Sequence, residues 1–182
     1  MRGRGDSMPK IIAIIVELAI CFCVLWNLSF LSALLHEIGH ALGYMLATGD
    51  TLWHIRIGWG KHLLNTKRLT VNLCPFDGFF TPLEKTKIDT AAKLIVILSG
   101  GPSVSLILVI GLLLLKLGGI SFHSEVIVPS AVETFISSAL SINSVILVLS
   151  LIPIHYFHGK IKGVETDGLQ IINAIRSYRS KQ

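Results

Sequence analysis

Three long apolar stretches, at about 11–46, 94–115 and 130–154, restrict what this chain can fold into. The hydrocarbon layer of a bilayer is about 30 Å thick, and a helix needs roughly 20 apolar residues to cross it. Each stretch reaches that length. A hydrophobic share of 52% and a mean hydropathy of +0.69 exceed what a soluble core requires. The sequence therefore predicts an all-α polytopic membrane protein, folded as a single domain over residues 1–182.

The first stretch is too long for one upright span. A continuous helix over 11–46 would be about 54 Å long. A turn near Asn27 would divide it into two short spans, but the sequence there contains neither glycine nor proline. We therefore expect one long helix that is tilted or kinked.

The basic residues indicate an orientation. Lys and Arg gather at 50–93 and again from 158 on, whereas the loop at 117–129 contains neither. Because basic residues concentrate in cytoplasmic loops, the long loop and the C-terminus are predicted to face the cytoplasm, and the N-terminus the outside, in a bacterial-type cytoplasmic membrane. The net charge of +5 then reflects topology, and no nucleic-acid partner is expected.

The cytoplasmic loop is predicted to contain a small β-hairpin. Apolar and polar residues alternate along 52–76, which is typical of half-buried strands. An exposed edge of this hairpin could bind an unwound substrate by strand addition; a hairpin that only packs over the helices fits the pattern equally well. Farther on, "GLQIINAIRSY" predicts a short amphipathic helix on the membrane surface.

The motif "HEIGH" at 36–40 points to a metal site. On a helix His36 and His40 face the same way, so that they can bind one zinc ion with Glu37 beside it as a general base. From the histidine and glutamate content, a chance match is expected about once in a hundred such chains. Ionisable residues at membrane depth are costly and usually functional, so the sequence predicts a zinc centre.

Two histidines leave a catalytic zinc one protein ligand short, because such sites usually have three ligands and a water. The candidates near the end of the third span are His155, His158, Glu165 and Asp167. Asp167 stands at a predicted helix start, where an aspartate is commonly a cap. The residues alone leave the choice open.

Four segments in order resemble the site-2 protease family of intramembrane zinc metalloproteases, in a minimal core form. They are "HEIGH", "LTVNLCPFDGFF" at 69–80, "LSGGPSVSLIL" at 98–108, and "INSVILVLSLIPI" at 142–154 with "TDGLQI" after it. The resemblance implies that Asp167 is the third zinc ligand. It also implies that Asn143 positions the substrate or donates to the oxyanion, although a hydrogen bond between helices would equally explain an asparagine there.

The chain departs from the family pattern in three places. Eleven residues, "HYFHGKIKGVE", separate Ile154 from Thr166, where the family usually has only a few. Ser150 stands in place of an asparagine, and Asp77 in place of the first glycine of a glycine pair. The first departure makes the role of Asp167 depend on a loop that folds back to the metal.

The resemblance implies a zinc-dependent endopeptidase that hydrolyses peptide bonds in or near the transmembrane segment of a membrane protein. The expected partners are that substrate and the lipid bilayer, with a homo-oligomer or a regulatory membrane protein as further candidates. The alternative is a non-enzymatic membrane binding or assembly protein that retains the fold. A metal transporter would carry ionisable residues throughout its spans, whereas here they cluster at one end of the first.

Overall fold

The computed structural model describes residues 7–118, 129–156 and 163–180. Three of its helices are long and apolar enough to cross a membrane: Lys10–Thr48, Ala91–Leu117 and Ala131–Leu151. This confirms a helical chain with three candidate spans and a small sheet. In chain order the elements are α1 (Ser7–Thr48), β1 (Trp53–Asn65), β2 (Leu69–Pro82), the short 3-10 helix η1 (Lys85–Lys87), α2 (Ala91–Leu117), α3 (Pro129–Leu151) and α4 (Asp167–Arg179).

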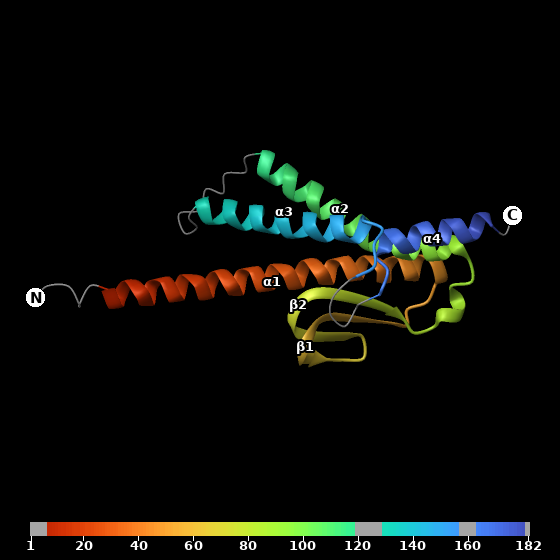
Figure 1. The fold of residues 1–182 in the computed structure, drawn as a ribbon, viewed down its shortest axis with the longest axis horizontal. Helices are drawn as coiled ribbons and strands as arrows, with labels where there is room; N and C mark the ends of the chain where they lie inside the picture. The colour runs from red at the N-terminus through yellow and green to blue at the C-terminus, as the bar shows by residue number, and fades with distance from the viewer. Residues whose placement is uncertain (1–6, 119–128, 157–162, 181–182) are drawn as a thin grey trace, which may run out of the picture.

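Helix α1 is continuous over 42 residues, which confirms the expectation of one long helix rather than two short spans. The side chain of Asn27 donates to the carbonyl of Cys23 at 2.8 Å, so its polarity is satisfied within the helix. At 1.5 Å per residue the helix is about 63 Å long. Its N-terminal end extends beyond the other helices (Figure 1), and the side chains from Ile11 to Leu25 are exposed.

Helices α1 and α2 approach closely where both carry glycine. A Cβ atom on Gly100 would clash with the carbonyl of Gly39, and one on Gly43 would lie 2.8 Å from the carbonyl oxygen of Val96. Small residues that let backbones approach are the usual packing device of membrane helices. Helix α2 continues through Pro102 without a break in the helix.

Helix α3 ends at Leu151, three residues before the predicted end of the third span at 154. Pro153 explains the difference, because proline has no N–H and disfavours helical geometry in the residue before it. The N–H of Ile152 still bonds to the carbonyl of Val148 at 3.0 Å. The chain then turns towards α4.

The small sheet packs along α1. Ile55 in β1 is paired with both Phe80 and Leu69, so the first part of β1 lies between two parts of β2. Ile55 and Ile57 are buried in one cluster with Ala33 and Ala41 of α1. The two-stranded antiparallel sheet confirms the predicted hairpin, although its second strand continues to Pro82 instead of ending near 76.

The sheet lies beside the apolar part of α1 rather than beyond its end. The indole N–H of Trp26 donates to the carbonyl of Leu73 in β2 at 2.6 Å, although Trp26 precedes the end of α1 by about six turns. Figure 1 shows the sheet on one side of α1, with α2 and α3 on the other. Helix α1 is therefore the element that the sheet and the other two long helices share.

Candidate metal centre

The two histidines of the motif face the same way, as their spacing predicts. His36 and His40 are both buried on α1, and their ring centroids are 5.0 Å apart. The Nε2 atoms of the two rings lie 3.3 Å from each other. Helix α1 thus presents two potential ligand atoms at one point.

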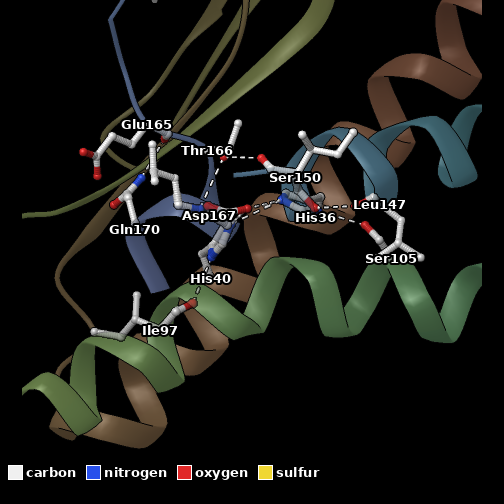
Figure 2. Close-up of polar contacts among 12 residues, drawn as sticks. His36, His40, Ile97, Ser105, Leu147, Ser150, Glu165, Thr166, Asp167 and Gln170 are labelled. Carbon is white, nitrogen blue, oxygen red and sulfur yellow. Dashed lines mark hydrogen bonds and ion pairs between the residues drawn. The ribbon is translucent and has the colours of Figure 1, made fainter. Parts of the chain in front are cut away.

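The Nδ1 atom of each ring contacts a residue of α2. The Nδ1 atom of His36 is 2.8 Å from the hydroxyl of Ser105, and the Nδ1 atom of His40 is 2.9 Å from the carbonyl of Ile97. A carbonyl oxygen only accepts hydrogen bonds, so His40 donates through Nδ1 and keeps its lone pair on Nε2. Contacts of this kind fix the orientation of metal-binding histidines. Figure 2 shows both rings between these α2 contacts and Asp167.

The carboxylate of Asp167 completes the cluster (Figure 2). Its Oδ2 atom lies 3.2 Å from Nε2 of His36 and 3.3 Å from Nε2 of His40. A tetrahedral zinc with bonds of about 2.0–2.1 Å has neighbouring ligand atoms about 3.3 Å apart. The three atoms therefore form a triangle of the right size for one face of such a site, and they can hold a metal.

The end of α3 and the start of α4 are tied together, and this brings Asp167 to the histidines. Thr166 donates its hydroxyl to the carbonyl of Ile152 at 2.6 Å, and its backbone N–H bonds to the carbonyl of Ile154 at 3.1 Å. A β-bridge between His155 and Glu165 closes the base of the segment between them. The unusual spacing in the sequence therefore does not separate Asp167 from the end of α3.

Contacts at the start of α4 fix the position of this aspartate further. The hydroxyl of Thr166 accepts from the backbone of Leu169, which caps the helix. A Cβ atom on Gly168 would clash with the carbonyl of Leu151. The glycine after Asp167 thus lets α4 begin directly against the end of α3.

The other candidate ligands do not join the cluster. His155 is exposed, and its Nε2 atom lies 3.6 Å from the carboxylate of Glu165. Glu165 also accepts from the side chain of Asn173 at 3.1 Å. His158 lies outside the described residues. Among the candidates that the structure describes, Asp167 is the one that meets both histidines.

Glu37 is buried against the sheet. A Cβ atom on Gly78 in β2 would overlap the carboxylate of Glu37, and the backbone N–H of Phe80 donates to that carboxylate. The sheet therefore holds the glutamate beside the cluster. The sequence identified Glu37 but not this role of Gly78; the glycine within "FDGFF" was the only available signal.

A second glycine leaves room at the cluster itself. A Cβ atom on Gly101 of α2 would overlap Nε2 of His40 and lie 2.6 Å from Nε2 of His36. These are the two ring atoms that face Asp167. The absence of a side chain at Gly101 keeps open the space that a shared ion requires. The sequence did not predict this role of Gly101.

The charge of Asp167 suits a ligand. Burial raises the pKa of this carboxyl, but hydrogen bonds with His36 and His40 outweigh that effect and lower its pKa to about 2. The group is therefore ionised at neutral pH. An ionised carboxylate is the form that binds a metal.

A cavity of about 560 Å³ opens beside the cluster. This volume lies within the range of ligand-binding sites. Its walls combine the cluster and Glu37 with part of β2 and with apolar side chains of α3, namely Ile142, Val145, Ile146 and Leu149. The site is thus accessible from a largely apolar cavity.

Asn143 lies between α1 and α3. Its amide nitrogen donates to the hydroxyl of Ser32 at 3.0 Å and to the carbonyl of Ala139 at 2.8 Å. Asn143 is not among the described residues that line the cavity. These contacts are those of a helix–helix hydrogen bond, and an oxyanion role for Asn143 stays a prediction.

Comparison of the chain with protein-family models, with curated proteins and with solved structures found no match. What the site does is therefore argued from its geometry.

Proposed function

We propose that this chain is a membrane-embedded zinc endopeptidase of the site-2 type, which cleaves peptide bonds in or near the transmembrane segment of another membrane protein. The observation that supports the proposal most is the triangle of His36, His40 and Asp167, with atoms 3.2–3.3 Å apart. Glu37 lies beside this triangle at the wall of the cavity.

His36, His40 and Asp167 would hold the metal, and Glu37 would move the proton. When bound, zinc supplies a Lewis acid that polarises the scissile carbonyl and acidifies water. Glu37 takes the proton from the attacking water and passes it to the leaving nitrogen as the C–N bond breaks. Two peptides result, one with a new carboxylate and one with a new amine.

The walls of the cavity suit an unwound apolar segment. Side chains of α3 would contact the substrate's apolar residues, and the stretch 75–80 of β2 lines the opposite side. An extended substrate can pair with the backbone of a strand edge. Unwinding is required because the peptide bonds of a helix are occupied by its own hydrogen bonds.

The chain would lie in a bacterial-type cytoplasmic membrane as a multi-pass protein. The three apolar helices support membrane association. The basic residues of the segment between α1 and α2 support a cytoplasmic location for the ends of the helices near the metal site.

Zinc content and cleavage together test the proposal. We would purify the wild type, Asp167→Ala and Glu37→Gln in detergent under identical metal exposure. About one zinc per chain is expected for the wild type and for Glu37→Gln, and clearly less for Asp167→Ala. Cleavage of a model transmembrane substrate is expected from the wild type alone.

Each deviation has a distinct meaning. Full zinc retention by Asp167→Ala would show that the third ligand is another residue. A wild type that binds zinc but cleaves no transmembrane substrate would favour the non-enzymatic alternative. A wild type that binds no zinc would contradict the metal site itself.

A further inference from the structure

Asp77 of β2 carries a carboxylate oxygen that lacks a partner. The residue lines the cavity, and its Oδ1 atom is buried without a hydrogen bond among the described residues. Burial raises the pKa of this carboxyl, and the charge of Arg56 and backbone hydrogen bonds from Asp77 itself and Gly58 oppose that effect only in part. A buried acceptor without a donor is costly, and native proteins usually avoid it.

Arg56 does not explain Asp77. In the part of the chain that the structure describes, no ion pair joins the two residues. The guanidinium of Arg56 instead lies over the ring of Phe79, 5.7 Å from its centroid. Its Nε atom is also buried without a partner. The charge of Arg56 acts on Asp77, but the two side chains form no ion pair.

The cavity has an excess of negative charge. Its described lining contains four carboxylates and neither Lys nor Arg; the four are Glu37, Asp77, Glu165 and Asp167. A divalent metal would balance Asp167 and Glu37. Glu165 has partners in Asn173 and His155. Among the described residues, Asp77 is therefore the cavity carboxylate that has backbone hydrogen bonds but no cation paired with it and one oxygen without a hydrogen bond.

Asp77 lies close in the sequence to the residue that contacts Glu37, the proposed general base. It directly precedes Gly78, the residue pressed against the carboxylate of Glu37. A substrate side chain that reaches Asp77 must therefore belong to a residue close to the bond that is cleaved. Lys and Arg are frequent at the cytoplasmic ends of transmembrane segments, so a membrane protein can supply such a group.

We propose that Asp77 is a specificity-determining residue, which selects a substrate with a Lys or Arg side chain within a few residues of the scissile bond. The inference rests on the proposed peptidase function and names its substrate class. The basic side chain pairs with the carboxylate of Asp77 at the wall of the cavity. An uncharged side chain of similar size leaves that carboxylate without a cation, and discrimination follows from the difference.

The test compares substrates that differ at one residue. A model transmembrane substrate would carry Lys, Met or Glu at each of the three positions on either side of the cleaved bond. At one of these positions the zinc-loaded wild type is expected to prefer Lys over Met by about tenfold in kcat/KM. Asp77→Asn is expected to abolish that ratio, and Asp77→Lys to reverse it in favour of Glu.

Two control variants separate this role from general effects of charge. Glu165→Gln removes another carboxylate of the cavity, and Arg56→Gln removes the cation whose charge acts on Asp77. Both are expected to keep the preference for Lys. If Asp77→Asn keeps the preference too, or if the wild type shows none, the inference is wrong.

A binding measurement distinguishes failure of the inference from failure of the peptidase proposal. Glu37→Gln and the double variant Glu37→Gln, Asp77→Asn would be titrated with the labelled Lys and Met substrates in nanodiscs. A Lys preference in the first that is absent from the second supports the role of Asp77, even if no variant cleaves. Equal binding of both substrates by Glu37→Gln overturns it, whether or not the wild type is a peptidase.

Discussion

The two halves of α1 both contain many apolar residues, but their surroundings differ. Side chains from Ile11 to Leu25 are exposed along the first half, whereas the second half is packed by α2, α3 and the sheet. The second half contains the small residues Ser32, Ala33, Gly39 and Gly43. Lipid is as apolar as leucine, so hydrophobicity does not drive helices together in a bilayer. The comparison teaches that small and polar residues, rather than apolar content, mark the packed half.

The largest effect is expected from a substitution that fills the space beside the proposed metal site in the packed half of α1. Gly101→Ala would place a methyl group against both histidine Nε2 atoms. We expect zinc affinity to fall about a hundredfold or more, and peptidase activity with it. Gly111→Ala is the matched control, because nothing lies within 4 Å of a Cβ there. Zinc per chain, measured against a graded chelator, checks both; equal retention would contradict the proposed position of the ion.

The second largest effect is expected at the sheet. Gly78→Ala would displace the carboxylate of Glu37 without contacting a metal ligand. A shift of about 1 Å in a catalytic group costs about a hundredfold in rate, so we expect activity to fall by that order while the zinc content stays near one per chain. Kinetics and metal analysis on the same preparation test this. Loss of zinc along with activity would show that the sheet supports the ligands instead.

A third change acts on packing between the helices. Gly39→Ala would force the backbone of α1 away from that of α2 at Gly100. Overpacking of this kind costs about 1–3 kcal/mol, so the melting temperature in detergent should drop by several degrees. Ala19→Leu, in the exposed half of α1, should leave it unchanged. Equal melting temperatures for Gly39→Ala and Ala19→Leu would contradict the difference in packing between the two halves of α1.

The smallest effect concerns pH at the end of α1. Burial raises the pKa of Asp50, but hydrogen bonds from Tyr44 and Leu52 and the ammonium of Lys87 outweigh it, so the pKa lies below its usual range. The resulting stability is present above the unfolded-state pKa of about 3.9 and is lost as pH falls through the lower folded-state value. Asp50→Asn should remove this component of the acid sensitivity. Melting temperatures at about pH 6 and about pH 3 check it, and an unchanged difference would contradict it.

The long elements could be predicted from the sequence because their signals are local. Apolar length identified the three candidate spans, and a missing turn signal at Asn27 favoured one long α1. The end of α3 was placed too late, because the apolar run continues past Pro153 although the helix does not. Alternation predicted the sheet but not its full extent.

The site was only partly predictable, because part of it depends on contacts between distant segments. The i, i+4 spacing of His36 and His40 is a local property and was sufficient. Asp167 could not be chosen on chemistry alone, since its approach depends on the β-bridge between His155 and Glu165. Nothing in the sequence indicates that Gly101 lies over the two histidine rings.

The proposed ligands come from the two ends of the fold, His36 and His40 from α1 and Asp167 from α4. During synthesis the histidines emerge first, and the aspartate emerges only after all three candidate spans. A growing chain therefore offers two imidazoles and no complete tetrahedral face. The order of synthesis therefore leaves the proposed zinc site incomplete until the last helix docks, so an unfinished chain would lack the proposed peptidase activity at the insertion machinery.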